Sequence, residues 1–105
     1  MATPPDLPVR TPTLERVRAL GPAIREIVER HGARNPRVFG SVARGEERAG
    51  SDIDILVNNV RLSLLRLFRL EDELETLLGM PVDVVLEEEV PQKTRERFMA
   101  GVVPL

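Results

Sequence analysis

The sequence contains no cysteine, no tryptophan and no tyrosine, and aromatic residues make up only 3% of its 105 residues. Without cysteine, the chain can form neither a disulfide framework nor a thiolate zinc site. The scarcity of aromatic rings removes the stacking platforms that proteins use to bind single-stranded nucleic acid. The composition therefore argues against a disulfide scaffold, a zinc-thiolate domain and a base-stacking protein.

Long apolar runs and a large excess of one charge are also missing. No stretch approaches the length of a signal-peptide core or a membrane span, which makes the cytoplasm the default location. The formal net charge of −2 gives no overall attraction to a polyanion, and no local basic patch stands out. We therefore expect no membrane association and no direct binding of nucleic acid, and we expect any bound anion to be held locally.

The length supports one small domain with a single modest core. It is too short for a catalytic domain plus a separate substrate domain, so another protein, or a second copy in a homo-oligomer, would have to help present an acceptor. Residues 1–12 hold four prolines among polar residues, and proline interrupts both helix and sheet hydrogen bonding. We predict an N-terminal arm over residues 1–12 and one domain over residues 13–105.

Two segments carry apolar residues at helical spacing. The first begins after Thr13, a suitable N-cap, and ends near Gly32, with a kink or a break into two helices at Gly21-Pro22. The second begins after Ser63 and ends at Leu78, before a glycine and a proline that stop it. Helices of this length need a sheet or other helices to cover their apolar sides.

Three short segments have the composition of strands. They are residues 37–40, entered through a turn at Asn35-Pro36, residues 52–57, and residues 82–86. A last helix should open with Pro91 at its first position. The order helix, strand, turn, strand, helix, strand, helix predicts an α/β fold of two layers, with a mixed sheet of about three or more strands and helices packed on it.

Asp52 and Asp54 alternate with apolar residues of the second predicted strand. Residues two apart on a strand point to the same side, so the two carboxylates should lie together while Ile53 and Ile55 enter the core. Close carboxylates repel each other, and a hard cation such as Mg²⁺ relieves this by taking them as ligands. Asp83 would join them if its strand is a neighbour, and three carboxylates suit a two-metal phosphoryl or nucleotidyl transfer site. The alternative is a solvent-facing strand with ordinary surface acids.

Gly40-Ser41 lies about ten residues before these acids. Gly40 would let the backbone approach a ligand closely, and Ser41 at the start of a helical turn would offer its hydroxyl and nearby N–H groups to phosphate oxygens. Taken alone, Gly-Ser is an ordinary turn between a strand and a helix. Its distance from Asp52 and Asp54 favours the phosphate-binding interpretation.

Together these residues resemble the signature of the nucleotidyltransferase superfamily that includes DNA polymerase β: Gly-Ser, about ten residues, then Asp-x-Asp. More closely, residues 40–45 and 51–57 resemble the minimal nucleotidyltransferase group. In that group the small catalytic domain stands alone and is commonly encoded beside a helical HEPN protein. The resemblance covers about residues 14–100, and the sequence does not depart from the pattern at the positions that carry it.

The resemblance implies a small polymerase β-like palm that uses two Mg²⁺ ions and takes ATP as substrate. It implies that Asp52 and Asp54 are metal ligands and that Gly40 and Ser41 hold the nucleoside triphosphate. Asp83 would be the third acid, which binds metal, takes the acceptor proton, or does both. Arg44 matches the group's Ala-Arg-Gly segment, where phosphate contact and a loop-anchoring ion pair remain alternatives.

Other polar and apolar features have simpler interpretations. His31, the single histidine, is expected to be a solvated residue in the last turn of its helix. Glu87, Glu88 and Glu89 are expected to be a solvated approach to the last helix. The apolar residues in 62–68 cannot all face one core; we expect most of them to be core, with a docking surface as the alternative.

We therefore predict a Mg²⁺-dependent nucleotidyltransferase that transfers AMP from ATP to a hydroxyl group. The resemblance implies an acceptor tyrosine on a cognate HEPN-family toxin, which would make the chain an antitoxin. Two alternatives remain: a binding module that neutralises its partner by docking alone, and a nucleotidyltransferase acting on a small molecule such as an aminoglycoside.

Overall fold

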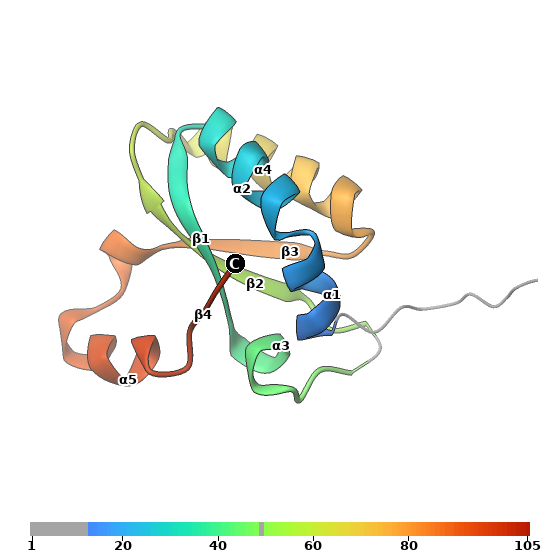
Figure 1. The fold of residues 1–105 in the computed structure, drawn as a ribbon. Helices are drawn as coiled ribbons and strands as arrows, with labels where there is room; N and C mark the ends of the chain where they lie inside the picture. Colours follow the sequence, from blue (N-terminus) through green and yellow to red (C-terminus); the bar gives the residue numbers. More distant parts are fainter. Residues whose placement is uncertain (1–12, 49) are drawn as a thin grey trace, which may run out of the picture.

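The computed structural model describes residues 13–48 and 50–105, and the predicted arm over residues 1–12 lies outside them. Helices α2 and α4 cover one face of a sheet, and α5 lies on the other side of it (Figure 1). The elements in chain order are α1 Leu14–Ala19, α2 Gly21–Arg30, β1 Ala33–Phe39, α3 Gly40–Arg44, β2 Ile53–Asn59, α4 Leu64–Leu78, β3 Val82–Leu86, the 3-10 turns η1 Glu87–Glu89 and η2 Gln92–Thr94, α5 Arg95–Met99 and β4 Val103–Pro104.

The sheet has four strands in the order β3-β2-β1-β4. Strand β2 pairs in parallel with β3, and β1 pairs antiparallel with both β2 and β4. The predicted α/β class and mixed sheet are therefore confirmed. The two-residue strand β4 was not predicted, because two residues are too few to show a period along the sequence.

The predicted helix boundaries follow from local side-chain chemistry. The hydroxyl of Thr13 accepts a hydrogen bond from the Arg16 N–H at 3.1 Å, and Ser63 caps α4 in the same way through the Arg66 N–H at 3.2 Å. The chain breaks into two helices at residue 20, and Pro22 lies in the first turn of α2, where its missing N–H costs nothing. None of the helices among the described residues combines the length and the apolar character that a membrane crossing requires.

Strand β1 is longer than predicted, and the expected turn at Asn35-Pro36 is wrong. Asn35 has a φ of +60°, and the pairing register between β1 and β2 shifts between Arg34 and Arg37. A bulge of this kind tolerates a proline inside a strand, because the local ladder is already interrupted. The chain therefore bends without leaving the sheet.

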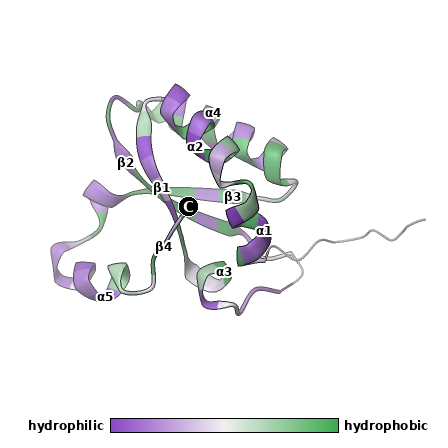
Figure 2. Cartoon of the chain, viewed as in Figure 1, coloured by the Kyte–Doolittle hydropathy of each residue, from purple (hydrophilic) through white to green (hydrophobic). Residues whose placement is uncertain are grey.

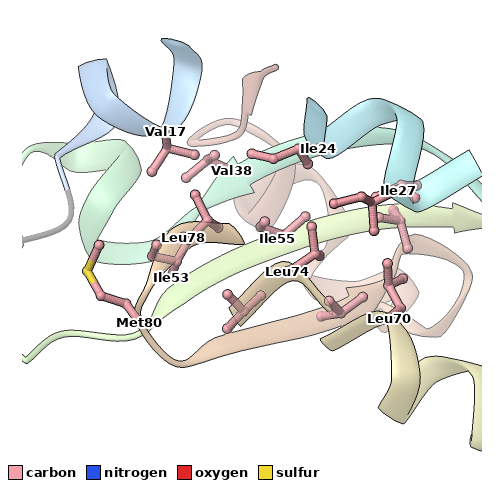
Figure 3. Packing of buried hydrophobic residues seen from close by; sticks show 14 of the residues in the cluster. Val17, Ile24, Ile27, Val38, Ile53, Ile55, Leu70, Leu74, Leu78 and Met80 are labelled. Atoms are coloured by element: carbon pink, nitrogen blue, oxygen red, sulfur yellow. The ribbon is translucent and has the colours of Figure 1, made fainter. Parts of the chain in front are cut away.

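One core lies between the sheet and its helices (Figure 3). The side chains of Ile53 and Ile55 point from β2 toward Leu74 and Leu78 of α4, and all four are at most 1% exposed. Helices α2 and α4 carry hydrophilic and hydrophobic bands, as partners of a half-buried sheet should (Figure 2). Residues Asp54, Leu56 and Asn58 alternate with the core residues of β2 and therefore face the other side of the sheet.

A polar network ties that second side together. Arg37, which is 6% exposed, donates to the Glu87 carboxylate at 2.6 Å, to the Asn58 side-chain oxygen at 2.9 Å and to the Asn35 carbonyl at 2.8 Å. Arg95 of α5 forms a second ion pair with Glu87. The network joins the bulge of β1, the far end of β2, the end of β3 and helix α5.

Candidate active site

The three predicted acids gather at one end of the central strands. Asp54 and Asp83 are directly paired in the parallel register of β2 and β3, which places them side by side on the same face. Neighbouring strands lie roughly 4.8 Å apart. Asp52 stands just before β2 and is exposed, as is Asp83, while Asp54 is partly buried. Asp83 was expected to join the other two acids if its strand is a neighbour of theirs, and the pairing of β2 with β3 confirms that it is.

Gly40 lies against this group of acids. Its φ is +77°, in the left-handed region that glycine favours, and a Cβ placed there would overlap the Asp54 Oδ2 atom and lie 3.2 Å from its Cγ atom. Phe39, the residue before it, pairs with Asp54 across β1 and β2. The turn that carries Gly40 and Ser41 is therefore in contact with the central carboxylate, and only glycine fits there.

The environment of Asp54 disfavours the charged form of its carboxylate. Burial raises its pKa above the ordinary value for aspartate, and the negative charges of Asp83 and then Asp52 raise the pKa further. Arg44 acts in the opposite direction, but the net pKa shift is upward. The site therefore carries uncompensated negative charge, and a cation among the carboxylates would relieve it.

The donor set suits Mg²⁺, which prefers hard oxygen ligands and is commonly held by one or two carboxylates together with substrate phosphates and water. Within residues 13–48 and 50–105, no three acidic or histidine side chains form a ready-made metal cage. A cation bound by Asp54 with Asp52 or Asp83 would thus need oxygen ligands from a substrate. Such an incomplete site is the usual arrangement where a metal bridges protein and phosphate.

Arg44 ends helix α3 on the same side of the turn. Its Nε atom donates to Glu46 at 2.8 Å, so the loop-anchoring ion pair considered from the sequence is present. Both side chains are more than half exposed, and a surface pair of this kind holds its partners weakly. Arg44 can therefore leave Glu46 and contact a phosphate instead.

A pocket of about 290 Å³ adjoins the turn and was not predicted. Its lining comes from the turn and from the C-terminal part of the chain: Phe39, Gly40, Arg44, Arg97, Phe98 and Gly101. The rings of Phe39 and Phe98 lie with their centroids 4.9 Å apart, which fixes α5 beside the turn. No local sequence pattern links Arg97 to Gly40 or Arg44, which lie more than fifty positions earlier. The sequence signal that could have pointed to this pocket is the pair Arg97-Phe98 itself.

The simpler interpretations of His31 and Glu87 prove wrong, whereas Glu88 and Glu89 are exposed as expected. His31 is not solvated: its Nε2 atom lies 2.8 Å from the Glu73 carboxylate, with 16% of its side chain exposed, and so joins α2 to α4. Glu87 is not solvated either, because it is the centre of the network with Arg37 and Arg95. Glu88 accepts a hydrogen bond from the Asn59 N–H at 3.1 Å.

The residues in 62–68 are mostly not core. Leu64, Leu65 and Phe68 are 68%, 60% and 54% exposed, and Val60 beside them is 58% exposed. Only Leu62 and Leu67 pack against the core. These exposed residues form an apolar patch next to a groove of about 190 Å³, at the end of the sheet opposite the acids. The alternative of a docking surface therefore fits this segment better.

Comparison with known proteins agrees with the geometry of the site. Residues 22–103 match the family described as "Nucleotidyltransferase domain". The chain is 40% identical over 93 residues to the protein adenylyltransferase MntA of Thermococcus cleftensis, covering 87% of this chain and 94% of that protein.

Two solved structures share the fold. One is of a minimal nucleotidyltransferase, with a TM-score of 0.77 and 45% identity, and it covers 89% of this chain and 96% of its own. The other is of the toxin–antitoxin MntA-HpeT, with a TM-score of 0.65 and 22% identity over 80% of this chain and 69% of its own. At that identity the second shows likeness of fold alone. The sequence match over most of the chain, together with the turn and the acids, shows that this protein belongs to the nucleotidyltransferase domain family.

Proposed function

We propose that the chain is a Mg²⁺-dependent adenylyltransferase that transfers AMP from ATP to a tyrosine hydroxyl of a HEPN-family toxin and so acts as an antitoxin. The observation that supports this most directly is the packing of Gly40 against Asp54 while Asp83 pairs with Asp54 in register. That arrangement brings a backbone turn open to phosphate into contact with carboxylates that need a cation. The adenylyltransferase name of the 40% identical relative supports AMP as the transferred group.

In the proposed reaction the acceptor oxygen attacks the α-phosphorus of ATP. A bond forms between that oxygen and the α-phosphorus, the bond to the β-phosphate oxygen breaks, and pyrophosphate leaves with its electron pair. We assign the proton of the hydroxyl to Asp83, which is exposed beside Asp54, and metal binding by Asp83 is the alternative role. Asp52 and Asp54 would hold Mg²⁺, which would supply charge neutralisation at the phosphates and lower the pKa of the acceptor hydroxyl. Gly40 and Ser41 hold the triphosphate in line with the acceptor.

The acceptor is proposed to be a protein because Asp52 and Asp83 are exposed at the end of the sheet, where a large partner can reach them. A partner that presents a tyrosine would complete the site from outside. The toxin–antitoxin assembly of the structural neighbour is in keeping with a toxin as that partner.

The proposal is tested by incubating the purified chain with Mg²⁺, ATP labelled on the α-phosphate and a candidate HEPN-family partner. We expect label on a tyrosine of the partner, and none with the Asp52→Asn/Asp54→Asn variant or after chelation of Mg²⁺. Asp72→Asn, an exposed acid on α4, is the matched control and should transfer normally. Absence of label with the unaltered chain would contradict the proposal.

The exposed apolar patch favours a second candidate, in which docking alone neutralises the partner. The same acid variant separates the two functions, because it keeps the patch and loses the metal ligands. If Asp52→Asn/Asp54→Asn neutralises the toxin as well as the unaltered chain does, docking is the function and transfer is not.

A further inference from the structure

Helix α5 carries a cationic side chain to the edge of the site. Arg97 and Arg44 both line the pocket of about 290 Å³ beside Gly40, one from the C-terminal part of the chain and one from α3. Both guanidinium groups are exposed. A pocket with two cations and a glycine whose backbone is accessible favours an anion with several oxygens.

The position of Arg97 is fixed by its neighbours on α5. Two residues earlier, Arg95 forms an ion pair with Glu87 and donates to the Glu87 carbonyl at 3.2 Å. One residue later, Phe98 packs its ring on Phe39 at 4.9 Å between centroids. The helix is thus held to the sheet on both sides of Arg97, so its backbone need not be ordered again when the side chain binds a ligand.

Arg97 is also unengaged in the part of the chain that the structure describes: no hydrogen bond or ion pair there involves its side chain, whereas Arg44 is paired with Glu46. An unengaged guanidinium is not needed for the fold. Gly40, which lines the pocket, lies against the Asp54 carboxylate, and Phe39 pairs with Asp54 across the strands. The pocket therefore continues directly from the proposed metal ligands.

The geometry points to Arg97 as a binding residue for the β- and γ-phosphates of the nucleoside triphosphate, the part that leaves as pyrophosphate, with Arg44 as its companion. This inference rests on the proposed function for the identity of the ligand. With the α-phosphate beside Asp54, the pocket is where the remaining phosphates can extend past Gly40. The two arginines then offset charge that the carboxylates would otherwise repel.

The test is isothermal titration calorimetry in Mg²⁺ buffer with two probes, inorganic pyrophosphate and AMP. AMP lacks the β- and γ-phosphates, so the two probes separate phosphate binding from contacts with the base or sugar. The variant is Arg97→Gln, and the matched control is Arg34→Gln, an exposed arginine near the opposite end of β1. Both positions are exposed, so the variants should fold, as checked by circular dichroism.

We expect Arg97→Gln to weaken pyrophosphate binding about tenfold or more and AMP binding by less than about twofold, with Arg34→Gln unchanged. Equal weakening of both probes, unchanged pyrophosphate binding, or no binding of pyrophosphate to the unaltered chain would overturn the inference. The labelled-ATP assay run in parallel separates the two claims. Transfer without an effect of Arg97→Gln on pyrophosphate defeats only this inference, and an effect on pyrophosphate without any transfer defeats only the proposed function.

Discussion

The change Glu87→Gln should destabilise the fold strongly, because Glu87 pairs with both Arg37 and Arg95. The Arg37 side chain is 8% exposed and that of Glu87 is 15% exposed. Glutamine keeps the shape but leaves the buried guanidinium of Arg37 without its carboxylate. Removing one partner of a buried pair costs about 3–5 kcal/mol, and the residual exposure of Glu87 places the expected loss near ~3 kcal/mol.

That loss is large for a small domain, whose total stability is about 5–15 kcal/mol. At roughly 4–8 °C per kcal/mol, the melting temperature should fall by about 12–24 °C. The measurements are urea unfolding for the free energy and thermal unfolding for the melting temperature. Both are followed by far-UV circular dichroism, because the chain has no tryptophan or tyrosine to report by fluorescence. Glu89→Gln, an exposed neighbour, is the control and should change stability by less than about 0.5 kcal/mol.

The pH dependence gives a second check on the same pair. The hydrogen bond from Arg37 lowers the pKa of Glu87 below its ordinary value, against the opposing effect of burial. A carboxylate with a lowered folded-state pKa contributes stability above its unfolded pKa of about 4.3, and this contribution is lost as pH falls through the folded value. The difference between the unaltered chain and Glu87→Gln should therefore be full at neutral pH and shrink below about pH 4. The expected loss is about 3 kcal/mol. If the unfolding free energy of Glu87→Gln at neutral pH lies within about 0.5 kcal/mol of that of the unaltered chain, the pair does not stabilise the fold as argued.

Three further predictions concern the site and the patch. Gly40→Ala should abolish transfer and cost about 1–3 kcal/mol of stability, because the added carbon overlaps Asp54 at a positive φ. Transfer is measured with labelled ATP and stability by urea unfolding, and a fully active variant would contradict the packing of Gly40 against Asp54. Without metal, Asp54→Asn should stabilise the chain by about 0.5–2 kcal/mol at neutral pH. Because the folded-state pKa of Asp54 is raised, this gain should disappear as pH falls below its unfolded pKa, and a gain that grows in acid would reverse the sign. Leu65→Ser should cost less than about 0.5 kcal/mol while Leu70→Ala costs about 2–5 kcal/mol in the same unfolding assay, and equal losses would place Leu65 in the core.

The first helices, the order of helices and strands along the chain, and the acids were predictable because each depends on short-range patterns. The predicted start of the last helix at Pro91 is wrong: Pro91 precedes the 3-10 turn Gln92–Thr94, and α5 begins only at Arg95. Ser63 and the glycine after Leu78 mark the ends of α4 by their own chemistry, and Val82–Leu86 is strand β3 as predicted. The alternation around Asp54 placed it correctly opposite the core face. The pairing of Asp54 with Asp83 could only be stated as a condition, because parallel pairing joins strands that are not adjacent in sequence.

The remaining features depend on contacts between distant segments. Nothing local distinguishes Glu87, which is bound by Arg37, from Glu89, which is exposed. The role of Arg97 likewise depends on the packing of α5 against β1 through Phe98. Asn35-Pro36 has the composition of a turn, and only the pairing with the neighbouring strand makes this segment a bulge within β1.

The packing of Gly40 against Asp54 also constrains how relatives of this chain can diverge. The space that a side chain at position 40 would need is already filled by the carboxylate, so the two positions cannot drift independently. A lineage that keeps the aspartate must keep the glycine, even if the nucleotide or the acceptor changes. A lineage that gives up the reaction and loses the aspartate removes this overlap, and only the positive φ of +77° then still disfavours a side chain at position 40. Both changes together would mark its descendants as binding proteins.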